Sequence, residues 1–115
     1  MSVFFRRRGE PPATTVAVTI TGSGHRGMCY ATINGVNQYE EGTHEVNTGD
    51  TITFGVYGTD NAGYVKIDGT EVLRVTSMTT ETYDWTVPSG ISTVEIAMRS
   101  TYSPTGYGRI TVTTA

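Results

Sequence analysis

The most constraining feature of this sequence is an alternation of apolar and polar residues in short runs. From residue 14 to residue 114, each run stops at a glycine, proline, asparagine or aspartate, the residues that favour turns. A period of two residues places apolar side chains on one face of a strand and polar side chains on the other. In the clearest run, 51–57, Ile52, Phe54 and Val56 share one face. The pattern therefore predicts an all-β protein.

Strands at intervals of roughly 8–12 residues, separated by turn signals, are typical of a β-sandwich. About seven to nine antiparallel strands are expected on this spacing. The expected strands lie at 14–21, 28–33, 36–40, 51–57, 64–67 and 71–76, with three more around Trp85, Ile96 and Ile110. The pairs Asn34-Gly35 and Asp68-Gly69 predict tight hairpins, because these residues tolerate a positive φ. Loops are expected at 22–27, 58–63 and 101–108.

Few large apolar residues are available to fill a core. The chain has one tryptophan and three phenylalanines, so Trp85 and Phe54 are expected at the centre of the core. Cys29 is the only cysteine, which leaves no partner for a disulfide within the chain. Its place in an alternating strand predicts a small buried residue rather than a reactive thiol.

Charge divides the chain into two parts. Residues 1–13 predict a flexible basic arm, and residues 14–115 predict the sandwich. The net charge is −3; Arg6, Arg7 and Arg8 against Glu10 leave the first twelve residues at +2, so the remainder carries −5. Such an acidic body argues against binding to nucleic acid, which needs clustered Lys and Arg on one face.

Several motifs bear on catalytic, cofactor or metal chemistry. Residues 22–27 spell G-x-G-x-x-G, but a strand and not a helix is expected to follow, so no dinucleotide site is predicted. His25, Cys29 and His44 lack the spacing of a zinc site. We expect no enzyme activity, no cofactor and no metal. A weak calcium site from turn aspartates (Asp50, Asp60, Asp68) stays open.

Tyrosines are the polar resource most suited to recognition, because a rigid ring with a hydroxyl supplies amphipathic contact area. They are interleaved with threonines and glycines, at outward strand positions or in loops. Either they form a binding surface or they merely cover the sheets. The candidate binding surface consists of Tyr30, Tyr57, Tyr64, Tyr102 and Tyr107.

The segment 42–54, G-T-H-E-V-N-T-G-D-T-I-T-F, and the segment 83–88, Y-D-W-T-V-P, resemble strands of bacterial and phage immunoglobulin-like domains. This resemblance implies an immunoglobulin-like β-sandwich. The cysteine pair of antibody domains is missing, so the likeness is to modules without a disulfide.

The start of the chain, M-S-V-F-F-R-R-R-G-E-P-P, resembles that of short prophage-encoded, virion-associated proteins. It implies a docking arm, made of Phe4, Phe5, Arg6, Arg7 and Arg8, that attaches the sandwich to a larger phage or surface assembly. The expected function is a non-enzymatic structural or adhesion module that presents loops to a surface or a protein. The alternative is a carbohydrate-binding module of a bacterial cell-surface system.

The first residues contain no apolar stretch of a secretory signal, and no run is long enough to cross a membrane. The chain is therefore expected to be made in the cytoplasm, without membrane insertion. If it derives from a phage, it reaches the outside in the virion after lysis.

Overall fold

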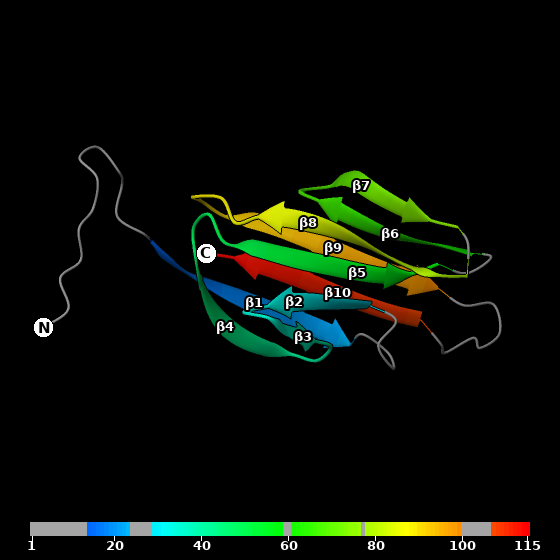
Figure 1. The fold of residues 1–115 in the computed structure, drawn as a ribbon, viewed down its shortest axis with the longest axis horizontal. Helices are drawn as coiled ribbons and strands as arrows, with labels where there is room; N and C mark the ends of the chain where they lie inside the picture. Colours follow the sequence, from blue (N-terminus) through cyan, green and yellow to red (C-terminus); the bar gives the residue numbers. More distant parts are fainter. Residues whose placement is uncertain (1–13, 24–28, 59–60, 77, 100–106) are drawn as a thin grey trace, which may run out of the picture.

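A computed structural model of the chain describes residues 14–23, 29–58, 61–76, 78–99 and 107–115 (Figure 1). The described residues form ten strands and no helix, which confirms the all-β prediction. The strands are β1 (Thr15–Ser23), β2 (Cys29–Ile33), β3 (Val36–Gln38), β4 (Gly42–Asn47), β5 (Thr51–Tyr57), β6 (Asn61–Ile67), β7 (Thr70–Val75), β8 (Thr80–Thr86), β9 (Ser92–Arg99) and β10 (Tyr107–Thr114).

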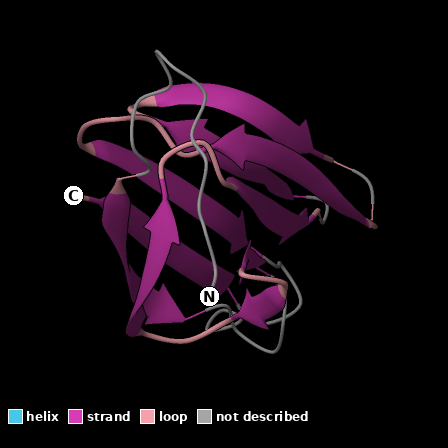
Figure 2. Ribbon diagram, turned by 60° about the vertical axis from the view of Figure 1, so that its left-hand side comes forward, coloured by secondary structure: helices cyan, strands magenta, loops and turns pink. Residues whose placement is uncertain are grey.

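The strands form two antiparallel sheets that lie face to face, a sandwich-like arrangement (Figure 2). The larger sheet has six strands in the order β4-β1-β10-β9-β6-β7, and the smaller has four in the order β3-β2-β5-β8. Strands β2 and β5 of the smaller sheet lie over β9 and β10 of the larger one (Figure 1). The two sheets bury their apolar faces against each other.

The core follows the sequence alternation closely. In β5, Ile52, Phe54 and Val56 are buried, as predicted, and Cys29 of β2 is also fully buried. The rings of Phe54 and Trp85 lie 5.7 Å apart between centroids. Phe54 has no exposed surface, whereas Trp85 stands on β8, an edge strand, and retains 9% exposure. Phe54 is therefore the central aromatic residue, and Trp85 lies nearer the rim.

Both predicted hairpins are present. Asn34 and Gly35 have φ values of 52° and 78°, and Asp68 and Gly69 have 49° and 86°. Two successive positive φ values twist the chain to match the right-handed twist of the paired strands.

Several elements differ from the sequence prediction. Strand β1 extends to Ser23, inside the expected loop 22–27, and β3 ends at Gln38 and not at residue 40. The segment expected only to lead into a turn forms a full strand, β4, so the strands number ten and not seven to nine. Strand β6 begins at Asn61, inside the expected loop 58–63, and the register shifts between Asn61 and Tyr64. Strand β10 begins at Tyr107, inside the expected loop 101–108. Glycines at these places obscured the alternation.

The edge strands carry features that discourage pairing with another chain. At the β4 edge, the side-chain amide of Asn34 donates a hydrogen bond to the Glu45 carbonyl (3.0 Å). On β8, Glu81 pairs with the buried Val56 of β5, so the two side chains share the face of the sheet that is turned toward the core. Glu81 nevertheless remains exposed, and its charge disfavours pairing with another chain at this edge. Strand β7 carries Glu71 and Arg74, and β3 has only three residues. The sheet faces and the loops are therefore the surfaces best suited to a partner.

Candidate binding face

The outward face of the smaller sheet gathers aromatic and polar side chains from neighbouring strands. The antiparallel register places Thr32 of β2 beside Asn37 of β3 and Thr53 of β5, and Thr53 beside Asp84 of β8. Further along β2, Tyr30 lies opposite Gly55. Residues that are directly opposite on antiparallel strands share a face. We call this surface the tyrosine face; it consists of Tyr30, Thr32, Asn37, Tyr39, Thr53, Gly55 and Asp84.

The ring of Tyr30 lies across the backbone of Gly55. A Cβ atom built at Gly55 would overlap Cζ of Tyr30, so no larger residue fits beneath the ring in this position. Tyr30 is half-buried, and its ring lies 5.6 Å from that of Tyr39 between centroids, tilted by 59°. The missing side chain at Gly55 thus allows the Tyr30 ring to lie over the sheet, beside the Tyr39 ring.

A row of polar groups runs beside the two rings. The Thr32 hydroxyl donates a hydrogen bond to Oδ1 of Asn37 (2.6 Å), and Nδ2 of Asn37 donates to the Tyr39 hydroxyl (3.3 Å). The Thr53 hydroxyl donates to Oδ1 of Asp84 (2.7 Å). These contacts hold a carboxamide, two threonine hydroxyls and a carboxylate in fixed positions, as a recognition surface requires.

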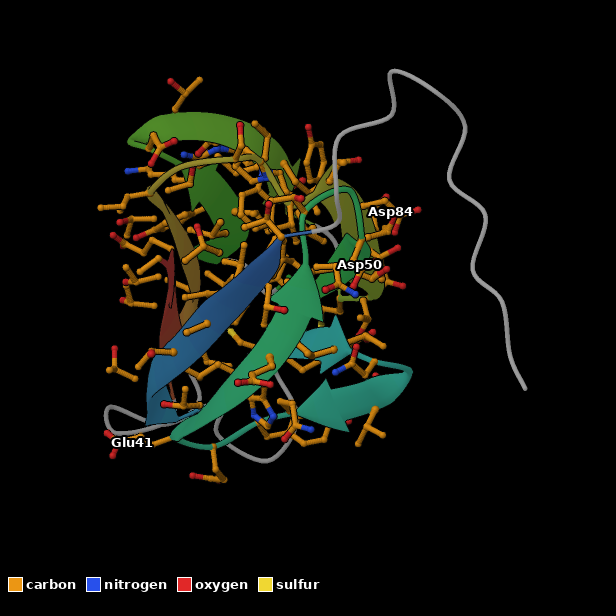
Figure 3. All side chains as sticks on the ribbon, turned by 90° about the vertical axis from the view of Figure 1, so that its left-hand side faces the viewer. Glu41, Asp50 and Asp84 are labelled. Atoms are coloured by element: carbon orange, nitrogen blue, oxygen red, sulfur yellow. The ribbon has the colours of Figure 1, made fainter. Side chains whose placement is uncertain are left out.

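The charges of the smaller sheet have one sign. In its four strands and the described residues directly beside them, every charged residue is acidic. They are Glu40, Glu41, Asp50, Glu81 and Asp84. Asp50 and Asp84 lie near the end of the molecule where β1 begins (Figure 3). This side of the molecule therefore suits a neutral or cationic partner and disfavours an anionic one.

The outward face of the larger sheet has a different character, since several of its charges are paired with neighbours. The Tyr64 hydroxyl donates to Oε1 of Glu95 (2.6 Å), and Nζ of Lys66 lies 4.7 Å from the centroid of the Tyr64 ring. Arg74 forms a two-pronged contact with Glu71 (2.7 and 3.1 Å). The hydrogen bond from Arg74 lowers the pKa of Glu71, because it favours the charged carboxylate.

The structure separates the predicted binding tyrosines. Tyr30 lies on the smaller sheet and Tyr64 on the larger one, so they do not form one surface. Tyr57 is half-buried and packs against the core. Tyr107 lies in β10 and not in a loop, which corrects the prediction, and Tyr102 lies outside the described residues.

The docking arm, Phe4, Phe5, Arg6, Arg7 and Arg8, also lies outside the described residues, so its predicted role stays a prediction. The polar row of the tyrosine face was not predicted from the sequence. Thr32, Asn37, Thr53 and Asp84 become neighbours only through the pairing of four strands. The sequence indicated only that each of these four residues stands at an outward position of its own strand.

The structure also places the glycine-rich segment and the candidate metal ligands. The glycine-rich segment is followed by strand β2, as predicted, and not by a helix. Asp50 and Asp68 lie at turns, where they accept hydrogen bonds from the backbone N–H groups of Asn47 (2.8 Å) and Thr93 (2.8 Å). Within the described ranges, no three His, Cys, Asp or Glu side chains gather as a metal site would require. His25 and Asp60 lie outside those ranges.

In the part of the chain that the structure describes, no helix has the length and hydropathy needed to cross a membrane. Comparison with protein-family models, with curated protein sequences and with solved structures found no match to this chain.

Proposed function

We propose that the chain is a non-enzymatic structural or adhesion module of the phage type, an immunoglobulin-like domain that binds a partner through the tyrosine face. The observation that carries the proposal is the hydrogen-bonded row beside the Tyr30 and Tyr39 rings. Tyrosine supplies large contact area at a low cost in conformational entropy, and fixed polar groups supply specificity.

The resemblance of the first residues to virion-associated proteins assigns the docking arm to the attachment of the sandwich. The two facing antiparallel sheets are compatible with an immunoglobulin-like domain, and edge strands that discourage pairing favour contact through a face. In this proposal the protein is made in the cytoplasm and leaves the cell with the particle at lysis.

Deleting residues 1–12 is expected to abolish incorporation into particles and to leave the fold unchanged, because the core lies between strands that begin at Thr15. Particles purified from an induced culture of the encoding host, probed with an antibody to the sandwich, measure incorporation. Circular dichroism checks the fold. Normal incorporation of the shortened chain would contradict the assigned role of the arm.

A carbohydrate-binding module is the second candidate, and the Tyr30 ring over Gly55, with the Tyr39 ring beside it, favours it. Sugar rings stack their C–H faces on flat aromatic rings, while Asn37, Thr53 and Asp84 offer partners for hydroxyl groups. If this candidate holds, Tyr30→Ala should weaken binding on a glycan array at least about tenfold, the loss typical of a central aromatic contact.

Tyr64→Ala, on the opposite face of the molecule, is the matched control for the glycan array and should bind as the unaltered protein does. Absence of any glycan bound through Tyr30 would leave the protein-binding candidate in place and remove the carbohydrate candidate.

A further inference from the structure

The charged residues of the smaller sheet are acidic, and the same chain contains a cluster of basic residues that could bind them. Three of the eight Lys and Arg residues stand together as Arg6, Arg7 and Arg8, directly after Phe4 and Phe5. The four cations in the described strands, Lys66, Arg74, Arg99 and Arg109, all belong to the larger sheet. Lys66 contacts Tyr64, and Arg74 contacts Glu71. Residues 6–8 are thus the largest group of neighbouring cations in the sequence.

We propose that the docking arm, Phe4–Arg8, binds the tyrosine face of its own chain while the protein is free. Its arginines contact Asp84 and stack on the Tyr30 and Tyr39 rings. The arm therefore covers the surface that is proposed above to receive the partner.

The tether that joins the arm to the sandwich has the right position and length. The N–H of Thr48 donates to the carbonyl of Thr14 (2.9 Å), and the N–H of Gly49 donates to the carbonyl of Val87 (2.9 Å). The turn 47–50 therefore contacts both the start of β1 and the residue that follows β8. Figure 3 shows Asp50 and Asp84 near this end of the molecule.

The path from Thr14 to Asp84 consists of the contacts with the turn 47–50 and a short length of β8. Asp84 lies three residues before Val87, about 10 Å along an extended strand at about 3.3 Å per residue. Arg8 lies six residues before Thr14, so an extended chain can carry it about 20 Å from that point. The proline pair at 11–12 lies within this tether and favours an extended conformation.

The chemistry of the two parts is complementary. A guanidinium group is planar and offers two parallel N–H groups to a carboxylate such as that of Asp84. The same group stacks on tyrosine rings through cation–π attraction, which suits the Tyr30 and Tyr39 pair. In the smaller sheet and the described residues beside it, no Lys or Arg would repel the arm.

Binding of the arm to the tyrosine face does not depend on the proposed function, but the biological consequence of this binding does. If the arm leaves the face to attach to a particle, the face becomes free at the place where a partner is needed. Contact with the particle and exposure of the tyrosine face would then be coupled, since one segment cannot occupy both sites.

The test compares ¹⁵N-labelled full-length chain with the triple variant Arg6→Gln, Arg7→Gln, Arg8→Gln in the same buffer. Backbone amide signals of Tyr30, Thr32, Thr53 and Asp84 should shift between the two proteins, whereas those of β1, β9 and β10 should coincide. In about 1 M salt the full-length chain should approach the variant, because charge attraction is then screened within about 3 Å. Superimposable tyrosine-face signals in low salt would overturn the proposal.

Two controls establish that the arm contacts Asp84 and that it does so within one chain. Asp84→Asn should shift the arm signals toward those seen in high salt, while Glu71→Gln on the larger sheet should leave them unchanged. The shifts should also be independent of protein concentration; dependence on concentration would assign the face to the arm of a second copy and overturn binding within one chain. Because the free protein is measured, a negative result leaves the particle-incorporation test of the proposed function unaffected.

Discussion

Replacing Phe54 with alanine is expected to lower the free energy of unfolding by about 3–5 kcal/mol, enough to unfold a large share of a marginally stable domain. Phe54 is completely buried between the two sheets and contacts the Trp85 ring. Truncation removes the transfer free energy of the ring and leaves a cavity that the surrounding strands fill only in part. Urea titration followed by tryptophan fluorescence measures the change.

Met78→Ala is the matched control for the core truncation, because Met78 is 63% exposed and a surface substitution changes stability by less than about 0.5 kcal/mol. A Phe54→Ala protein as stable as the Met78→Ala protein would show that Phe54 does not stand in the core.

Replacing Gly63 with alanine is expected to cost about 1–3 kcal/mol, the range for overpacked interiors. A Cβ at Gly63 would lie 2.7 Å from the carbonyl oxygen of Tyr57 and 2.7 Å from Cγ2 of Val56. The first contact is with backbone, so rotation of a side chain cannot relieve it. Gly63 therefore allows β6 of the larger sheet to approach the end of β5 in the smaller one. Thermal unfolding followed by circular dichroism gives the loss of stability.

Gly42→Ala provides the comparison for Gly63→Ala. The nearest contact there is Nε2 of His44 at 3.4 Å, at the far end of a flexible side chain. Its stability should be unchanged or slightly raised, because alanine restricts the unfolded chain. Equal stability of the two alanine variants would mean that β6 and β5 are not in close contact at Gly63.

The sequence predicts the parts of the fold that depend on local periodicity. Alternation places Ile52, Phe54 and Val56 in the core, and the Asn34-Gly35 and Asp68-Gly69 pairs form the predicted hairpins. These features require only neighbours in the chain, so a single sequence contains the information. The limits of β6 and β10 were wrong because glycine carries no side chain that could show an alternation.

The tyrosine face could not be predicted from the periodicity of single strands. The sequence predicts outward or loop positions for Tyr30 and Tyr64 alike, but it does not state which sheet each strand joins. Strand order puts Tyr30 and Thr53 on one sheet and Tyr64 on the other. It also brings Asp84 within 2.7 Å of Thr53, although 31 residues separate them in the chain. Pairings of this kind depend on the whole fold.

The absence of a side chain at Gly55 links the fold to the proposed surface. Gly55 leaves the space that the Tyr30 ring occupies, so the position of the ring is set by the backbone beneath it. A tyrosine without contacts would lose more conformational entropy when a partner binds than this half-buried ring, which packs over Gly55 and beside Tyr39. Preorganisation is the property that distinguishes Tyr30 from a tyrosine on a free loop.

The first described strand lies inside the larger sheet, between β4 and the last strand, β10. Val18 pairs with Thr114, close to the opposite end of the chain. During synthesis, β1 therefore lacks its second neighbouring strand until residues 107–114 have been made. Closure of this sheet therefore depends on contacts between residues that lie far apart in the sequence, and contacts of this kind are expected to make folding slow.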